Sequence, residues 1–334
     1  MDTTERGSGM LFADPDPDAA RAWFRTKSRR LESKVTTVRD AVRELVADGS
    51  YLGVGGFGTN RIPTSLLHEI VRQGRTRLGV AGHTSTHDFQ ILAAGGCIDR
   101  CDVAYAVGLE ARGLSKVGRR LFETGALQVT EWTNAALAWR YRAAAMGIPF
   151  IPARVMLGTD TLAKSAAVVI NCPYTGIPLV ALPALYPDVA LIHVHRADAY
   201  GNCQIDGITV ADEELARAAK RVIITCERLV HTDEIRAHPD RTRIPWYLVD
   251  AVIEVPFGGY PGNVAGEYFS DETHLQAWMA ADIDDASITA FVDRHIRATA
   301  DFGEYLALCG GLARLQALRA EELMSIPVHE GTRP

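Results

Sequence analysis

Residues 51 to 63 read Tyr-Leu-Gly-Val-Gly-Gly-Phe-Gly-Thr-Asn-Arg-Ile-Pro. The first four residues predict a short buried strand, and the glycines that follow predict a tight turn. Pro63 suits the first position of a helix, which we expect to span Thr64 to Gln73 and to end at Gly74. A strand, a glycine turn and a helix in this order are typical of a βαβ unit, in which the turn lies at the carboxyl edge of a parallel sheet.

The same alternation of β-branched runs and helical patterns continues along the chain. We expect further strands at 77–81, 103–107, 127–131, 179–182, 189–195, 221–226 and 251–255. Helices are expected at 37–47, 89–94, 116–124, 135–146, 275–281, 287–299 and 302–318. Residues 149–178 contain four prolines and are expected to form a long irregular excursion. The predicted fold class is α/β, an open, mostly parallel sheet with flanking helices.

Composition limits the classes of function. The chain has 334 residues and a net charge of -6, which argues against a nucleic-acid-binding protein. No uninterrupted apolar run approaches the roughly 20 residues of a membrane span, and residues 1–33 lack the apolar segment of a signal peptide, so we expect a cytoplasmic protein. We divide the chain into an N-terminal extension (1–33), either disordered or docked on a partner, one α/β domain (34–327) and a C-terminal tail (328–334).

The glycine turn has three interpretations from its residues alone. Gly53, Gly55 and Gly58 match the G-x-G-x-x-G pattern of dinucleotide-binding proteins, but that fold also calls for an acidic residue at the end of the next strand. The sequence there is Val80-Ala81-Gly82-His83, without a carboxylate. The turn could also be purely structural. In the third interpretation, the glycines let backbone N–H groups approach an anion or a carbonyl oxygen.

Polar side chains follow other predicted strands. Thr84 and Ser85, in the stretch from His83 to Asp88, could bind an acyl carboxylate or serve only as turn and helix-capping residues. Glu110 follows the third strand and is either a carboxylate at the cleft, even a general base, or a surface ion-pair residue. Arg154, in the predicted excursion, could pair with a substrate carboxylate or form a structural ion pair.

Two histidines suggest a metal pair, which we do not favour. His193 and His195 lie two positions apart on a predicted strand and would point to the same face. No third ligand is evident in the sequence, so we predict no metal site. Asp198, followed by Gly201 and Asn202, is expected to form a turn.

The stretch from Asp48 to Pro63 resembles the first signature of the family I coenzyme A transferases. The resemblance lies in Asp-Gly, an apolar strand, Gly-Gly-Phe and a proline six residues after the phenylalanine. The ending Asn60 to Pro63 is similar to the α subunit of glutaconate CoA-transferases, whereas the succinyl type usually has glycine where Arg61 stands. Further similar blocks follow in the order of the family, at 68–74, 147–152, 188–193, 211–227 and 250–258.

This resemblance implies an α-type, or A-type, subunit that needs a β-type partner in a hetero-oligomer. In the family, a glutamate of the partner takes CoA from an acyl-CoA and passes it to a carboxylic acid through a glutamyl-CoA thioester. The expected substrate is therefore the CoA thioester of a short acid, with dicarboxylic acids as one candidate class, and no tightly bound cofactor is expected. The residues expected to bind substrate or CoA are Gly55, Gly56, Phe57, Gly58, Thr59, Asn60, Arg61, Thr84, Ser85 and Arg154.

Two other functions stay open at this point. Some relatives of the family hydrolyse acyl-CoA rings, and an acidic residue of this chain, such as Glu110, would favour that reaction. A non-catalytic scaffold subunit is the second alternative. The glycine turn argues against it, because a scaffold has no need for Gly55 and Gly56 at a strand end.

Overall fold

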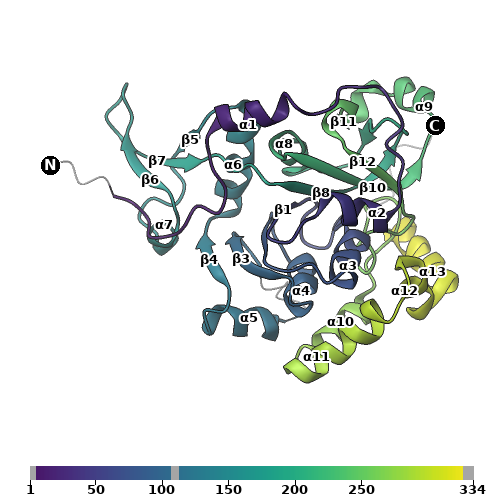
Figure 1. Cartoon of the computed structure of the whole chain (residues 1–334). Helices are drawn as coiled ribbons and strands as arrows, with labels where there is room; N and C mark the ends of the chain where they lie inside the picture. Colours follow the sequence, from purple (N-terminus) through teal and green to yellow (C-terminus); the bar gives the residue numbers. More distant parts are fainter. Residues whose placement is uncertain (1–4, 107–112, 326–334) are drawn as a thin grey trace, which may run out of the picture.

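The computed structural model describes residues 5–106 and 113–325 and is built on one large sheet (Figure 1). Within these residues the large sheet has nine strands, of which β9 and β11 are antiparallel and the others run parallel in the order β12-β10-β8-β1-β2-β3-β4. The strands are β1 (Tyr51–Val54), β2 (Leu78–Gly82), β3 (Ile98–Val103), β4 (Gln128–Glu131), β8 (Val189–Ala197), β9 (Cys203–Gln204), β10 (Arg221–Leu229), β11 (Thr242–Ile244) and β12 (Ala251–Glu254). The predicted α/β class with an open, mostly parallel sheet is confirmed.

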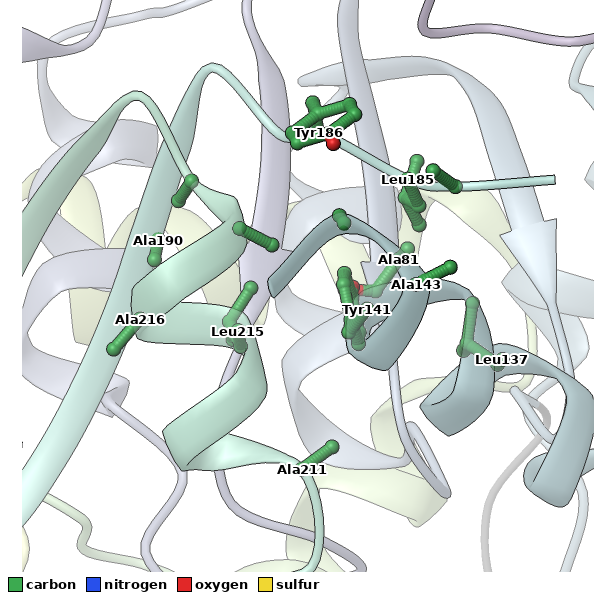
Figure 2. Close-up of a cluster of buried hydrophobic side chains, with 14 of the residues drawn as sticks. Ala81, Leu137, Tyr141, Ala143, Leu185, Tyr186, Ala190, Ala211, Leu215 and Ala216 are labelled. Atoms are coloured by element: carbon green, nitrogen blue, oxygen red, sulfur yellow. The ribbon is translucent and has the colours of Figure 1, made fainter. Parts of the chain in front are cut away.

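Helices cover both faces of this sheet, because its strands are apolar on both sides. Along β8, Ala190 and Ile192 belong to one buried cluster, and Val189 and Leu191 belong to the other. The first cluster is completed by α6 and α8, whose side chains meet over the sheet in Figure 2. The helices near the sheet are α2 (Val38–Leu45), α3 (Thr64–Arg72), α4 (His87–Ala94), α5 (Lys116–Glu123), α6 (Asn134–Met146), α8 (Asp212–Ala218) and α9 (Thr232–Ala237).

The order of strands places a crevice beside β1. Strand β1 pairs with β2 on one side and with β8 on the other. The strands that follow β1 along the chain therefore lie on both sides of it in the sheet. Ligands of open α/β sheets bind at such switch points, outside the carboxyl ends of the strands. Because β1 pairs with β8 only as far as Leu191, residues 192–197 of β8 continue past the end of β1 and past the glycine turn.

Residues 149–178 are more regular than the sequence suggested. They include β5 (Phe150–Ala153), α7 (Asp160–Lys164) and β6 (Val168–Asn171), and they lead into β7 (Pro178–Pro183). The three strands form a separate antiparallel sheet in the order β5-β7-β6. The predicted irregular excursion was therefore wrong. The prolines fit because Pro152 lies in the outer strand β5 and Pro178 is the first residue of the central strand β7.

The third strand was also misplaced, at 103–107 instead of Ile98–Val103. Its apolar pattern is broken by Asp102, which is buried. The Asp102 carboxylate receives the hydroxyl of Tyr51, the indole N–H of Trp132 and, at 2.7 Å, the guanidinium of Arg140. Buried charges persist when they are paired in this way, and a pattern of hydrophobicity does not reveal them.

The N-terminal extension lies on the body of its own chain. Arg6 forms a bridge with Val168 at the edge of the small sheet, and α1 (Pro17–Phe24) follows. The Lys27 ammonium lies 2.8 Å from the carboxylate of Asp250. The sequence had suggested an extension that is either disordered or docked on a partner. In the structure, residues of the extension contact the surface of their own chain.

The C-terminal part is helical, as predicted. It contains α10 (Glu272–Ala281), α11 (Asp285–Val292), a π-type turn (Asp293–Arg297), α12 (Phe302–Leu308) and α13 (Gly311–Ser325). Its own buried cluster joins Tyr260 and Tyr268 to Phe302, Tyr305 and Leu318. None of the helices in the described ranges is both long and apolar enough to cross a membrane.

Candidate active site

The glycine turn follows β1 at the carboxyl edge of the sheet and lies close against β8 and α8. The Gly55 N–H donates to the Leu191 carbonyl at 2.9 Å, and the Gly56 N–H donates to the carboxylate of Asp212 at 2.8 Å. A Cβ atom on Gly55 would lie 2.5 Å from that carboxylate, so any other residue there would have to displace the Asp212 side chain. Gly56 has a φ of 76°, which only glycine adopts readily.

Arg61 supports this turn from behind. Its guanidinium is fully buried, 2.7 Å from the second carboxylate oxygen of Asp212 and 2.8 Å from the Ile208 carbonyl. The sequence placed Arg61 among the residues that bind substrate. In the structure the guanidinium of Arg61 is paired with the buried carboxylate of Asp212, and this ion pair holds the turn against α8.

The tip of the turn is joined to the loop that follows β2. Phe57 and Asn60 exchange two backbone hydrogen bonds, at 2.9 and 3.1 Å, which closes the tip. The Gly58 N–H donates to the Thr84 carbonyl at 2.9 Å, and the Thr86 hydroxyl donates to the Gly58 carbonyl. Residues 57–60 are all partly exposed, so the tip is the part of the turn that a ligand can reach.

The two candidates after β2 differ in their surroundings. The Thr84 hydroxyl is partly exposed and lies 3.1 Å from both the Asn134 amide and the His83 ring. Ser85 is buried and donates to Asp88 at 2.5 Å. Thr84 therefore lies at the edge of the sheet beside the tip, with His83 and Asn134. The Ser85 side chain instead stabilises the turn before α4 through its hydrogen bond to Asp88. Burial lowers the pKa of His83.

The segment after β12 completes the site, and it was not among the site residues predicted from the sequence. Asn263 donates its backbone N–H to the Thr59 carbonyl at 3.0 Å and accepts the Arg61 N–H at 2.8 Å. A Cβ atom on Gly262 would lie 2.1 Å from the Thr59 carbonyl oxygen, so the two loops touch through their backbones. The glycines at 258, 259 and 262 were the available signal, since glycine-rich stretches mark close backbone approach.

The histidines of β8 have separate partners. The two ring nitrogens of His193 lie 2.7 Å from Glu227 and 2.8 Å from Thr225. In His195, Nε2 lies 2.9 Å from the Ala265 carbonyl and Nδ1 accepts the backbone N–H of Asp206. These contacts require a neutral His195 ring, and burial lowers its pKa. Within residues 5–106 and 113–325, no three His, Cys, Asp or Glu side chains gather to hold a metal.

Three carboxylates lie behind these loops, and all are enclosed. Asp212 is held by Gly56 and Arg61. Glu227 accepts hydrogen bonds from the Tyr268 hydroxyl and from the backbone N–H of Phe257. Asp88 is buried, which raises its pKa, and it accepts from the residues just before α4. None of these three carboxylates is open to a substrate.

The remaining candidates lie elsewhere. Arg154 is exposed directly after β5, in the small sheet that Figure 1 shows apart from β1. Glu110 falls in 107–112, outside the described residues. Asp198 forms the predicted turn, because one of its oxygens accepts the N–H groups of Tyr200, Gly201 and Asn202.

Known proteins are similar to this chain in sequence and in fold. The family model Coenzyme A transferase matches residues 35–255. An uncharacterised protein of Archaeoglobus fulgidus is 48% identical over 98% of this chain and 74% of its own length. The A-type subunit of the 3-oxoadipate CoA-transferase from Pseudomonas knackmussii is 36% identical over 82% of this chain and 98% of its own.

A solved structure has a similar fold. The crystal structure of glutaconate coenzyme A-transferase from Acidaminococcus fermentans superposes with a TM-score of 0.83 at 30% identity, covering 86% of this chain and 96% of that one. The resemblance inferred from the glycine turn is thereby confirmed. The chain belongs to the family I coenzyme A transferases, among their A-type subunits.

Proposed function

We propose that this chain is the A-type subunit of an acyl-CoA:carboxylate CoA-transferase and that a B-type subunit supplies the nucleophilic glutamate. The observation that carries the proposal is the tip of the glycine turn, residues 57–60, which is partly exposed at the switch point of the sheet. The three carboxylates behind it are all enclosed in hydrogen bonds. These three carboxylates are therefore unavailable to attack a substrate, which favours a nucleophile supplied by the partner subunit.

The proposed reaction moves CoA in two exchanges. The partner's glutamate attacks the thioester carbonyl, the C–S bond breaks, and an acyl-glutamyl anhydride and CoA thiolate form. The thiolate then attacks the glutamyl carbonyl, which releases the first acid as a carboxylate and leaves a glutamyl-CoA thioester. The acceptor acid repeats these steps in reverse order. A covalent carboxylate intermediate divides one difficult exchange into easier steps.

The substrate that we favour is a short dicarboxylic acyl-CoA. The two named relatives act, by their names, on 3-oxoadipate and glutaconate, which are both dicarboxylates. The second carboxylate of such a substrate needs hydrogen-bond donors beside the tip of the turn. Thr84 and Asn134, together with His83, are the polar side chains that the structure gathers there.

Co-expression with a B-type subunit tests the proposal. The purified complex is incubated with a panel of acyl-CoAs, treated with hydroxylamine or borohydride, and both chains are analysed by mass spectrometry. We expect modification of a glutamate on the partner and CoA transfer that depends on an acceptor acid. The chain without its partner is the control and should form no adduct.

Two other outcomes would replace the proposal. Acyl-CoA consumption without an acceptor acid and without an adduct on either chain would indicate a hydrolase, and Glu110→Gln would then be the first variant to make. A complex that binds no CoA ester at all would indicate a scaffold subunit.

A further inference from the structure

A pocket forms where the N-terminal extension passes the end of α8. Its volume is about 540 Å³, and it is lined by the extension, by α8 and by the 3-10 turn Trp246–Leu248. Figure 1 shows α1 next to α6 and α8, and the extension donates there through Arg21 to the Gly147 carbonyl and through Lys27 to the Lys220 carbonyl. Pockets of about 300 to 1,000 Å³ bind drug-sized organic ligands.

This pocket lies at the opposite edge of the sheet from the glycine turn. Ala219 lines it just before β10 begins, and Leu248 lines it shortly before β12 begins. Since β1, β8, β10 and β12 are parallel, their amino ends lie at one edge and the glycine turn lies at the other. Helix α8 shows the same separation, because Asp212 at its start contacts the turn and Arg217 in its last turn lines the pocket. The pocket is therefore a separate site.

Aromatic side chains form the walls of the pocket. They are Phe24, Trp246 and Tyr247, and the last two rings meet edge to face with their centres 6.1 Å apart. Trp246 is fixed from both its ring and its backbone: the Lys34 ammonium lies 5.3 Å from the ring centre, and the Trp246 N–H donates to Asn202 at 3.2 Å. Tyr247 is 50% exposed. Such walls favour a ligand with a flat apolar ring, which can stack on them or meet them at its edge.

The charges of the pocket are positive. Lys27, Arg29 and Arg217 line it, and none of the described lining residues carries a carboxylate. Part of this charge is structural, because α1, α6 and α8 all end here and the carbonyl ends of helices attract cations. Lys27 has this role, since its ammonium donates to two backbone carbonyls and pairs with Asp250.

The two arginines keep donors for a ligand. Arg217 donates through Nη1 to the Glu213 carbonyl of its own helix, and the same atom lies 3.8 Å from the Glu213 carboxylate, on a side chain that is 40% exposed. For Arg29, the described residues offer its guanidinium no acceptor. Guanidinium groups bind carboxylates and phosphates through paired N–H donors. Two guanidiniums beside aromatic walls thus suit an anionic group attached to a ring.

We propose that this pocket binds an organic anion that carries a flat ring, with the ring against Trp246 and Tyr247 and the acidic group on Arg29 and Arg217. The acidic group is a phosphate, as in a nucleotide, or a carboxylate, as in an aromatic acid, because both accept from the same donors. This site is distinct from CoA transfer and does not depend on it. Phe24, Lys27 and Arg29 precede residues 35–255, so part of the pocket lies outside the region that the family model matches.

Titration calorimetry on the complex with a B-type subunit tests the site. The probes are AMP for the phosphate class and phenylacetate for the carboxylate class, and we expect at least one of them to bind once per copy of this chain. Arg29→Gln and Arg217→Gln should each raise the Kd of that probe about 10-fold, because each removes a charge-assisted hydrogen bond. Tyr247→Ser should raise it by a similar factor through the lost ring contact.

Two controls separate the site from general attraction of anions. Arg119→Gln removes an exposed arginine on α5, away from the pocket, and should leave the Kd unchanged. The acidic group alone, inorganic phosphate or acetate, should bind at least about 10-fold more weakly than the whole probe. If it bound as tightly, the ring would have no part in binding and the proposal would be wrong.

The remaining outcomes also decide the proposal. Failure of both probes to bind at millimolar concentration would overturn it. So would binding that Arg29→Gln and Arg217→Gln leave unchanged, since the probe would then lie elsewhere, for instance in the acyl-CoA site. CoA transfer measured without a probe should be the same in the wild type and in these variants. The rate of that reaction tests the proposed function, and the Kd of the probe tests this pocket.

Discussion

One carboxylate oxygen of Asp212 accepts the Gly56 N–H at 2.8 Å, while the other lies 2.7 Å from the guanidinium of Arg61. Both charged side chains are essentially inaccessible to solvent. A single residue at the start of α8 therefore holds the first and last parts of the glycine turn. The tip between them, residues 57–60, is in turn attached to the loops after β2 and β12.

Asp212→Asn should destabilise the protein strongly. The asparagine oxygen can still accept the Gly56 N–H, but the buried charge of Arg61 loses its counter-ion. Breaking a buried ion pair by removing one partner costs about 3 to 5 kcal/mol, because the other charge stays buried. We expect a fall of about 3 kcal/mol in the free energy of unfolding, measured by urea denaturation.

Glu123→Gln is the control for that variant. Glu123 pairs with Arg119 at 2.7 Å on the surface of α5, where both side chains are 61% exposed. Such exposed pairs contribute between about 0 and 1 kcal/mol. If Asp212→Asn cost no more than Glu123→Gln, the buried pair would not be what holds the turn.

Gly56→Ala and Gly58→Ala should differ, although both glycines have positive φ angles, 76° and 57°. A Cβ atom on Gly56 would lie 2.5 Å from the Asn60 carbonyl oxygen, whereas one on Gly58 meets no atom within 4 Å. Gly58→Ala should cost only the left-handed backbone of an alanine, about 1 kcal/mol. Gly56→Ala adds a clash with the backbone and should cost at least about 2 kcal/mol more.

Thermal or urea unfolding of the two variants decides this comparison, and the activity of the complex gives a second measure. We expect Gly58→Ala to retain CoA transfer and Gly56→Ala to lose most of it, because the shift needed at Asn60 moves the partly exposed tip of the turn. Equal stabilities for the two variants would show that the turn moves to accommodate a methyl group at either position. That result would contradict the close packing described for Gly56.

The sequence predicted the architecture well because local patterns and the glycine turn agree on it. The strand at Tyr51–Val54 and the helix from Thr64 lie where their residues placed them. The turn between them lies at the carboxyl edge, as a βαβ unit requires. These features depend on residues close together in the chain, which is why periodicity and turn chemistry reveal them.

The candidate site was predicted only in part, because its remaining contacts join distant segments. Asp212 meets Gly56 across 156 residues, and Asn263 meets Thr59 across 204. Arg61 looked like a substrate-binding cation for the same reason: its buried partner lies 151 residues away. A single sequence carries no record of such pairs.

The N-terminal extension should depend on Lys27. Its ammonium lies 2.8 Å from Asp250 and donates to the Leu248 carbonyl at 2.5 Å, with only 10% of the side chain exposed. Lys27→Met leaves the Asp250 carboxylate with one donor, the Val222 N–H, and should lower the free energy of unfolding by about 1 to 3 kcal/mol.

Limited proteolysis with chymotrypsin gives an independent measure of the same contact. Detachment of the extension should expose the aromatic residues at the end of α1, Trp23 and Phe24, and speed cleavage there. Arg29→Gln changes an exposed residue on the same segment and should leave the cleavage rate as in the wild type. A Lys27→Met protein that resists cleavage equally well would show that the extension is held by its apolar contacts alone.

His274 should make the protein less stable in mild acid. Its ring lies 3.0 Å from the Tyr305 hydroxyl and 3.6 Å from the Cys309 sulfur, with His295 and Asp271 close by. Burial, reinforced by His295, lowers its pKa from 6.5 to about 4. Between these values the unfolded chain binds a proton that the folded protein does not. Stability is therefore unaffected by this group above pH 6.5, falls as the pH drops toward 4, and levels off below that.

His274→Gln removes this contribution and should flatten the pH profile. The difference in unfolding free energy between variant and wild type should be constant above about pH 6.5. It should then shift in favour of the variant by up to about 2 to 3 kcal/mol at pH 4. Urea midpoints measured from pH 4 to 8 test this, with His238→Gln, a change at an exposed histidine, as the control. Parallel profiles for His274→Gln and the wild type would mean that His274 titrates alike in the folded and unfolded chain, and that the aromatic cluster around it admits a charge.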